Sequence, residues 1–421
     1  MERLNYLSVP LVGSTVCLRP LVLNEVFALV VAFSAIMILV LKRVNQALAI
    51  FAGVLALGLL TLLPPLNYVN VLMNVLGSWA NYELLLSIAL IGCLGNLLKD
   101  TGIMSDLMAE LRKFLSPRSI VALIPALMGL LPMPGGALLS APMIEGEADR
   151  LGVSGEFKTF LNVAFRHIWF WVLPLSSGII FEVRFSHLDV ATVVLTQLPL
   201  FFILLLLSSV VTVATVRSKV SADGGRVNAG LLVLSIGPIA AAVALNFVGV
   251  PIYLALLPSF LVVFLLKRCA GGEVCRRVYR GIPWTLVAAT FGILLFRAVS
   301  DETGAFTAVF QMLQGFEVSP LLFSIGFALA GGFVSALPTT AIPLIFPLVL
   351  PMLSGMSAPV AVAVVYCSII TGYLVSPLHM CLLLTNGYYK ASLPRTYLYW
   401  LPVALATFAM GIGSILLIGR V

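Results

Sequence analysis

The polar residues best suited to chemistry gather in one largely apolar segment, residues 159–182. They are Asn162, Arg166, His167, Ser176 and Ser177. A guanidinium can hold a carboxylate through two parallel hydrogen bonds, and an imidazole can carry a proton near neutral pH. An arginine within a membrane segment is costly and predicts a functional site, here for a small anion. The alternative is that Arg166 extends its charge to the membrane surface.

A second set of polar residues lies in matching positions later in the chain. It consists of Thr339, Thr340, Ser376 and His379. The positions equivalent to Arg166 and His167 are occupied by Ile369 and Ile370, and a basic pair in one half only suits an asymmetric anionic ligand. His379 is interpreted either as a ligand or proton carrier or as a hydrogen-bonded packing residue.

Proline and glycine interrupt the apolar stretch 119–144 near its middle. The residues at and after the interruption are Pro134, Gly135, Gly136 and Ser140. A helix that stops inside a membrane leaves backbone groups unpaired; its N-terminal end favours anions, while carbonyls and hydroxyls can hold Na⁺. We therefore predict that these residues help to enclose the substrate, unless they merely kink ordinary helices. The positions predicted for Na⁺ are near Gly136, Ser177, Thr340 and Ser376.

These polar positions are few because the chain is overwhelmingly apolar. Of its 421 residues, 61% are hydrophobic and 10% charged, against roughly 45–50% and about 25% in soluble proteins. Apolar runs long enough to cross a bilayer core of about 30 Å recur along the whole length. The composition excludes a soluble enzyme, a nucleic-acid-binding protein and a disordered chain. It predicts an all-α polytopic membrane protein.

Ten membrane-spanning helices are predicted, five in each half of the chain. Those of the first half lie near 22–41, 47–64, 82–98, 159–182 and 191–216. Those of the second half lie near 229–247, 251–267, 283–299, 359–386 and 397–419. The interrupted stretches 119–144 and 319–352 are predicted as re-entrant helical hairpins. The 13 residues before the first break would extend only about 20 Å as a helix.

Three short motifs recur in the same order in the two halves. The pairs are Asp100-Thr101-Gly102 with Glu302-Thr303-Gly304, Pro134–Ala137 with Pro338–Ala341, and Val172–Leu175 with Val375–Leu378. An odd number of spans per half inverts the second half relative to the first. The sequence thus predicts two inverted-topology repeats, which are typical of secondary transporters. The predicted divisions are an interfacial segment 1–23, repeats 24–217 and 229–421, and a cytoplasmic linker 218–228.

The distribution of basic residues orients this topology in the membrane. Of the 24 Lys and Arg residues, 18 fall on one predicted side, five on the other, and Arg166 lies within a span. The positive-inside rule makes the richer side cytoplasmic. We therefore expect a multi-pass protein of the cell inner membrane with both termini outside the cytoplasm.

Two inverted halves, each with a proline-broken span and a hairpin, resemble the ion transporter superfamily. That group includes dicarboxylate/sodium symporters, citrate transporters and gluconate-type permeases. Two motifs are similar to those of an uncharacterised prokaryotic membrane family within it: Pro134-Gly135-Gly136-Ala137 with Ser140-Ala141-Pro142, and Phe165-Arg166-His167-Ile168-Trp169. The resemblance implies an elevator mechanism, usually in a homodimer. The Ser-Asn-Thr tips of the dicarboxylate symporters are absent, so their substrate and sodium sites are not carried over.

These features predict a secondary active transporter of a small organic anion, coupled to Na⁺ or H⁺. We expect no enzymatic activity and no cofactor. The expected partners are the substrate, the lipid bilayer and a second copy of the chain, without nucleic acid. The alternatives are an intramembrane enzyme or flippase acting on a lipid-linked anionic substrate, with His167 or His379 as acid or base, and a passive channel.

Overall fold

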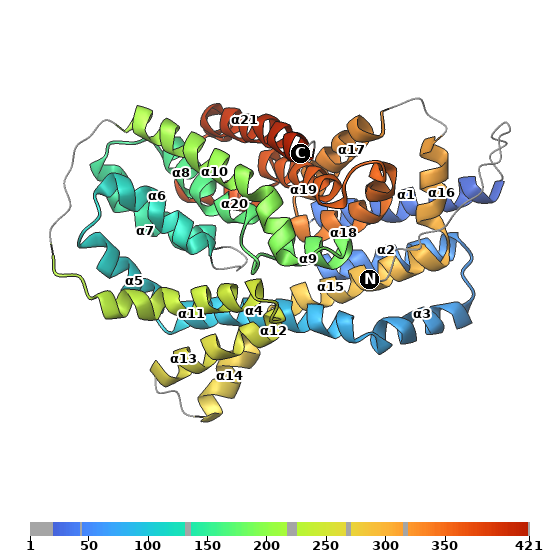
Figure 1. Ribbon diagram of the computed structural model, residues 1–421, viewed down its shortest axis with the longest axis horizontal. Coiled ribbons are helices and arrows are strands. Elements are labelled where there is room, and N and C mark those ends of the chain that lie inside the picture. The colour runs from blue at the N-terminus through green and yellow to red at the C-terminus, as the bar shows by residue number, and fades with distance from the viewer. Residues whose placement is uncertain are drawn as a thin grey trace.

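The computed structural model describes residues 20–42, 44–130, 136–216, 225–266, 271–314 and 319–419, and these contain helices but no strand. The first half comprises α1 (Pro20–Leu41), α2 (Gln46–Leu60), α3 (Pro65–Gly77), α4 (Trp79–Asp100), α5 (Ile103–Arg112), α6 (Pro117–Gly129), α7 (Ala137–Arg150), α8 (Gly155–His167), the 3₁₀ helix η1 (Ile168–Trp171), α9 (Ser177–Ser186) and α10 (Val190–Thr215). The second half comprises α11 (Ala229–Phe247), α12 (Ile252–Ala255), α13 (Leu257–Leu266), α14 (Gly271–Gly281), α15 (Trp284–Glu302), α16 (Ala305–Gln314), α17 (Pro320–Ser335), α18 (Pro338–Val349), the 3₁₀ helix η2 (Leu350–Leu353), α19 (Ala358–Val375), α20 (Met380–Tyr388) and α21 (Leu393–Ile418). The molecule is elongated, with α5 to α8 toward one end and α1, α3 and α16 toward the other (Figure 1).

Seven helical stretches of the described chain are long and apolar enough to cross a membrane. They are Leu23–Val40, Trp79–Asp100, Val190–Thr215, Ala229–Phe247, Trp284–Glu302, Ala358–Tyr388 and Leu393–Ile418. The prediction of an all-helical, multi-pass membrane protein is thereby confirmed. Four of the ten predicted spans are shorter or divided. The span 47–64 is the 15-residue α2, 251–267 is split into α12 and α13, and 159–182 and 359–386 are both broken. Prolines explain these ends, since a proline lacks the N–H that would continue the preceding turn.

Both segments predicted to be broken by proline are interrupted in the structure. The first passes from α8 through η1 and a non-helical stretch around Pro174 before α9 begins. The second leaves α19 at Val375 and resumes as α20 at Met380. The hydroxyls of Ser176 and Ser376 accept hydrogen bonds from backbone N–H groups two or three residues later. Each serine thus satisfies a backbone donor that the break would otherwise leave unpaired.

The two stretches predicted as hairpins each consist of two packed helices, α6 with α7 and α17 with α18. The residues between α6 and α7 at positions 131–135 are not among those described. The predicted site residues Pro134 and Gly135 therefore lie outside the described residues. The same holds for residues 1–19 of the predicted interfacial segment and for residues 217–224 around the predicted linker.

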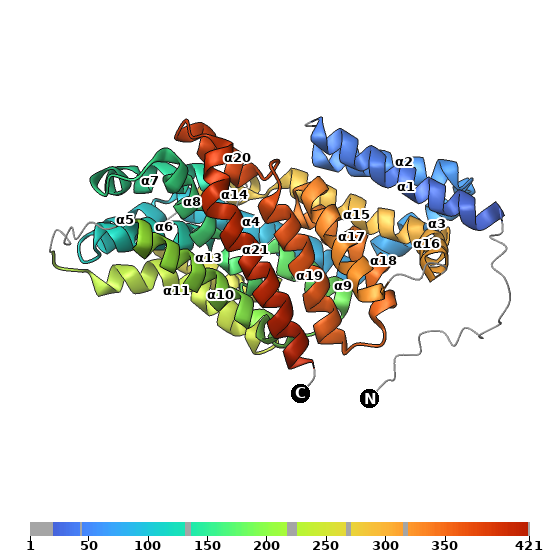
Figure 2. The same ribbon diagram turned by 90° about the horizontal axis from the view of Figure 1, so that it is seen from above.

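The helix pairs of the two halves pack in a reciprocal way. The first arms, α6 and α17, lie along α8 and α19 of their own half. The second arms, α7 and α18, contact α20 and α9, which follow the breaks in the opposite half. The long helices α10 and α21 pack together near the middle of the molecule (Figure 2). Each half therefore helps to hold the hairpin of the other.

The matching motifs at the ends of α4 and α15 adopt the same local structure. The Oγ1 atom of Thr101 donates to Leu97 O at 2.7 Å, and that of Thr303 donates to Val299 O at 2.8 Å. The glycine that follows has a φ of 74° in the first motif and 69° in the second. A left-handed residue directly after the helix is the usual role of glycine at a helix C-terminus.

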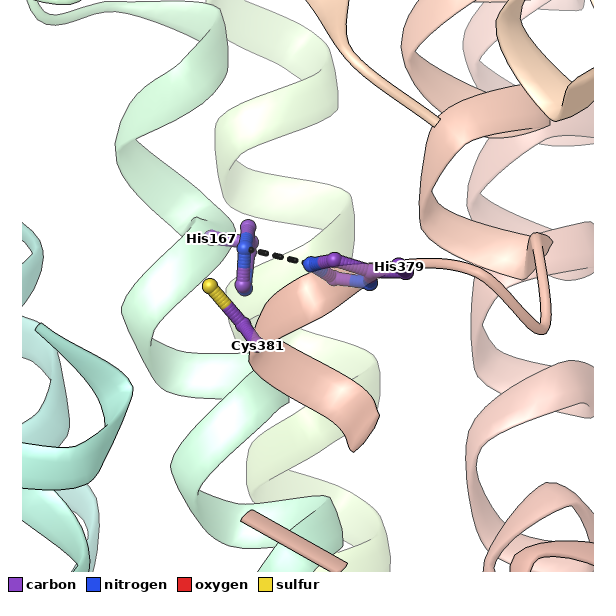
Figure 3. Close-up of side chains that lie close together, drawn as sticks. All are labelled: His167, His379 and Cys381. Atoms are coloured by element: carbon purple, nitrogen blue, oxygen red, sulfur yellow. Dashed lines mark hydrogen bonds between the residues drawn. The ribbon is translucent and has the colours of Figure 1, made fainter. Parts of the chain in front are cut away.

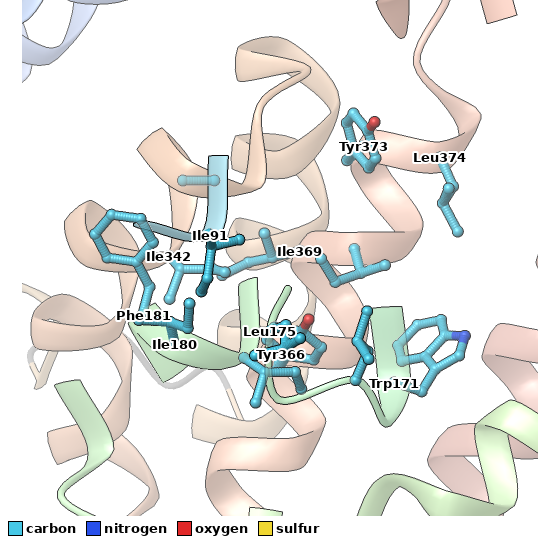
Figure 4. Packing of buried hydrophobic residues seen from close by; sticks show 14 of the residues in the cluster. Ile91, Trp171, Leu175, Ile180, Phe181, Ile342, Tyr366, Ile369, Tyr373 and Leu374 are labelled. Atoms are coloured by element: carbon cyan, nitrogen blue, oxygen red, sulfur yellow. The ribbon is translucent and has the colours of Figure 1, made fainter. Parts of the chain in front are cut away.

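The apolar core where α9, α18 and α19 meet is tightly packed (Figure 4). Its fully buried side chains include Phe181, Ile342, Tyr366 and Ile369. Beside it, α17 approaches α19 so closely that a Cβ atom added at Gly332 would lie 2.0 Å from Ile369 O. Small residues allow such close approach between helices in membranes.

Candidate functional site

The side chain of Arg166 lies between the ends of the two arms of the first hairpin. Its Nη1 atom donates a hydrogen bond of 2.8 Å to Met128 O, near the C-terminal end of α6. On the other side the guanidinium covers Gly136, where an added Cβ would lie 2.2 Å from Nη2. Arg166 is only 7% exposed, so the side chain points into the protein and not along its surface.

No carboxylate among the described residues pairs with Arg166. The neighbouring polar groups are the Cys381 thiol and the Tyr373 hydroxyl, and the stretch 131–135 contains no acidic residue. The carbonyl end of α6 offers only a partial negative charge. Burial of a full charge without a partner is expensive. The arrangement therefore leaves a positive charge that a bound anion would neutralise.

A second polar junction, one turn before Arg166, joins three helices. The Nδ2 atom of Asn162 donates to Ala137 O at 3.0 Å and to Thr385 Oγ1 at 2.9 Å. Its Oδ1 atom accepts from Ser140 Oγ at 2.5 Å. Asn162 and Ser140 are both fully buried. These bonds fix the start of α7 against α8 and α20, and so hold Gly136 next to Arg166.

The two histidines predicted in separate halves meet at the junction of α8 and α20. Their Nε2 atoms are 3.1 Å apart (Figure 3), and both side chains are buried. The Nδ1 atom of His167 lies 2.6 Å from Val163 O. A carbonyl only accepts, so Nδ1 carries the proton and the Nε2 lone pair of His167 faces His379.

Cys381, which is not among the predicted site residues, lies beside this histidine pair. Its Sγ atom, one ring nitrogen of His167 and one of His379 all lie within 4.8 Å of one another. A single residue separates His379 from Cys381, and this His-x-Cys spacing is the signal that could have identified the thiol.

The hydroxyls predicted at the second hairpin are bound by a residue that the sequence analysis did not select. The Nε2 atom of Gln46 donates to Thr340 Oγ1 at 2.7 Å and to Thr339 Oγ1 at 3.4 Å. This links the start of α2 to the start of α18. The helix that begins at Ser177, α9, also packs against α18. The predicted site residues therefore form two groups, one around Arg166 and His379 and one around Thr340.

A cavity of about 360 Å³ lies between α4, α9, α10, α11 and α12, and none of the predicted site residues lines it. Two of its polar atoms, Arg184 Nε and Asn246 Oδ1, are buried and make no hydrogen bond within the described chain. His187 also lines it, and burial, together with the charges of Arg297 and Arg184, lowers the pKa of this imidazole. His187 is therefore neutral at pH 7.

A buried carboxyl group was also missed. Glu182 is the last residue of the predicted span 159–182, but the structure buries it completely in α9, where it accepts a hydrogen bond from Gln197 Nε2. The second carboxyl oxygen of Glu182 and Oε1 of Gln197 are buried without partners in the described chain. The signal in the sequence that could have indicated a buried polar partner was Gln197, a polar residue within the otherwise apolar α10.

The fold is shared with a protein of known structure. The crystal structure of the YdaH transporter from Alcanivorax borkumensis superimposes with a TM-score of 0.60 at 13% sequence identity, covering 85% of this chain and 89% of that chain. Among curated proteins, none matches this sequence. The family described as "Protein of unknown function (DUF401)" matches residues 24–418, and the chain is therefore a member of that family.

Proposed function

We propose that this protein is a secondary active transporter of a small organic anion and that Arg166 binds the anion. The observation that carries the proposal is the buried guanidinium, which lies between α6 and α7 and pairs with no carboxylate of the described chain. The first residues of α7 have no side-chain cap, so N–H groups at the positive end of that helix are available to the same anion. The fold shared with a transporter is in keeping with this function.

We also propose that residues 24–217 and 229–421 are inverted repeats that move as an elevator. Three features support the repeats: the matching ends of α4 and α15, the interrupted segment in each half, and the reciprocal packing of the hairpins. In this mechanism the hairpins and broken helices carry the anion past the other helices. A homodimer would supply the fixed scaffold.

Transport is proposed to be coupled to Na⁺ or H⁺. The proposed Na⁺ position keeps Ser177, Thr340 and Ser376. Gly136 is left out, because the guanidinium of Arg166 lies against it and would repel a second cation. Glu182 adds a group that could carry H⁺, because a carboxyl buried without a cation favours its neutral form. Uptake with a Na⁺ gradient or a pH gradient alone distinguishes the two.

The test is uptake of a panel of carboxylates by proteoliposomes, comparing Arg166→Ala with Arg166→Lys. We expect the alanine variant to lose uptake and the lysine variant to retain part of it, since an ammonium keeps the charge but not the planar fork. The matched control, Arg184→Lys, should transport normally. Wild-type uptake by Arg166→Lys would exclude bidentate binding by Arg166.

The topology is tested separately by cysteine labelling after replacement of the six native cysteines. A cysteine at Gly272 should react only from the cytoplasmic face, and one at Gly355 only from outside. Reaction of both from the same face would contradict the inverted repeats. Conversion of a lipid extract by the purified protein, without uptake, would instead favour the enzyme alternative.

A further inference from the structure

We propose that His167, His379 and Cys381 form a binding site for Zn²⁺ at the junction of α8 and α20. This inference goes beyond the proposed transport and does not depend on it. Nitrogen and sulfur donors together suit Zn²⁺ better than Na⁺, Mg²⁺ or Ca²⁺, which prefer oxygen. The cluster contains two of the only three histidines in the chain.

The spacing of the donor atoms fits a tetrahedral ion. Two histidine nitrogens bound at about 2.0–2.1 Å in tetrahedral geometry are about 3.3 Å apart, and the Nε2 atoms of His167 and His379 are 3.1 Å apart. The thiol lies within 4.8 Å of one ring nitrogen of each histidine, whereas a bound sulfur lies about 3.6 Å from each nitrogen. A rotation that moves Sγ by about 1 Å completes the set. In Figure 3 the imidazoles of His167 and His379 face each other, and the Cys381 side chain lies beside them.

The hydrogen bonds around the site favour metal binding by Nε2. His167 donates its Nδ1–H to Val163 O, which is the usual outer bond of a metal-binding histidine. In the neutral pair, His379 must donate Nε2–H to His167, and its own Nδ1 is then a buried acceptor without a partner in the described chain. Binding of Zn²⁺ at Nε2 moves this proton to Nδ1, near the Leu374 carbonyl. The ion would therefore satisfy an atom that the neutral pair leaves unpaired.

The charges near the site are compatible with a bound ion and one open position. Zn²⁺ requires the Cys381 thiolate, and the guanidinium of Arg166 lies close to this sulfur. Two imidazoles and one thiolate leave the fourth tetrahedral position free for water or an anion. No acidic side chain of the described chain is needed to complete the site.

The experiment measures metal binding by the purified full-length protein in detergent, without transport. We expect about one Zn²⁺ per chain by elemental mass spectrometry. Replacement by Co²⁺ should produce a thiolate-to-cobalt charge-transfer band and strong visible bands of tetrahedral geometry, and Zn²⁺ should abolish them. Cys381→Ser should lose the charge-transfer band, and His379→Gln should lower Co²⁺ affinity at least tenfold. The matched controls, Cys367→Ser and His187→Gln, should bind as the wild type does.

A measurement on the unmodified protein covers the case in which these variants do not fold. Zn²⁺ should protect Cys381 from alkylation, as seen by peptide mass spectrometry, while the reactivity of Cys367 stays unchanged. Absence of Co²⁺ bands from the wild type, or the same bands in Cys381→Ser, would overturn the proposal. Either result would assign the histidine pair to a hydrogen bond between α8 and α20, and would leave the transport proposal intact.

Discussion

Gly136→Ala offers a sharp test of the anion site, because it displaces Arg166 without removing it. The new Cβ would lie 2.2 Å from Nη2, 2.8 Å from Cζ and 3.0 Å from Nη1. Ordinary contact begins at 3.4 Å, so the guanidinium must withdraw by more than about 1 Å. The backbone itself accepts alanine, since φ at this position is −58°.

The expected effect on binding is much larger than the effect on folding. The displaced guanidinium loses its hydrogen bond to Met128 O, and a hydrogen bond from a charged group contributes about 1.5–3 kcal/mol. The change from glycine to alanine adds about 0.5–1 kcal/mol to the free energy of unfolding, because alanine restricts the unfolded chain. The net loss of stability is therefore about 0.5–2.5 kcal/mol. Loss of one charge-assisted contact to the anion lowers affinity about 10- to 150-fold.

The assay compares uptake kinetics and thermal unfolding of Gly136→Ala with those of Gly146→Ala. Gly146 lies in the same helix and has open space around its Cβ position, so its variant should transport normally. We expect Gly136→Ala to remain folded while its KM rises at least tenfold. An unchanged KM in a folded Gly136→Ala protein would refute the placement of the anion between Arg166 and the start of α7.

Three further predictions concern stability. Gly332→Ala should lower the free energy of unfolding by about 3 kcal/mol or more, because the added methyl meets backbone and cannot be accommodated by a side-chain rotation. Gly326→Ala lies in the same helix with nothing near its Cβ position, so it should leave the stability unchanged. Equal melting temperatures of the two variants would contradict the close helix packing. Asn162→Ala removes three buried hydrogen bonds and should cost about 2–4 kcal/mol, measured by thermal unfolding; a loss below about 0.5 kcal/mol would rule out the three-helix junction. The backbone N–H of Asn228 and a nearby lysine lower the pKa of Glu110, so this contact stabilises the protein above the pKa of the unfolded state and weakens as pH falls through the pKa of the folded state. Proteolysis of the wild type between α10 and α11 should therefore accelerate in acid. An identical pH profile of proteolysis for Glu110→Gln would exclude the contact.

The breaks in the two long segments were predictable because proline acts on its own local backbone. Pro174 and Pro377 interrupt their helices wherever the surrounding chain folds. The amphipathic helices α3, α5, α14 and α16 were missed, since a search for long apolar runs passes over them. In α5 the buried residues recur with helical spacing, as Ile103, Leu107 and Leu111 illustrate. Periodicity would have found this helix where mean hydropathy did not.

The approach of His167 to His379 could not be predicted in the same way. The two residues are 212 positions apart, and their distance depends on how α20 packs against α8 and α7. No local pattern encodes that packing. The sequence marked each histidine as a polar residue near a break, but it could not pair them or add Cys381. The same limit applies to Gln46, whose bond to Thr340 spans 294 positions.

The internal repeat proposed above would also explain why the polar site occurs once. An offset of 203 residues, taken from the two prolines, makes Ser176 the counterpart of His379 and Ile370 the counterpart of His167. The region of Ile370 is an apolar core in the structure, filled by residues such as Tyr366 and Ile369 (Figure 4). In the proposed repeat, the two halves provide two equivalent junctions between a helix and the break of the opposite half. One junction is packed with hydrocarbon and stabilises the fold, while the other carries the arginine, the histidines and the thiol. A duplicated architecture with one polar junction suits a ligand whose own two ends differ, since only one of them needs a positive charge.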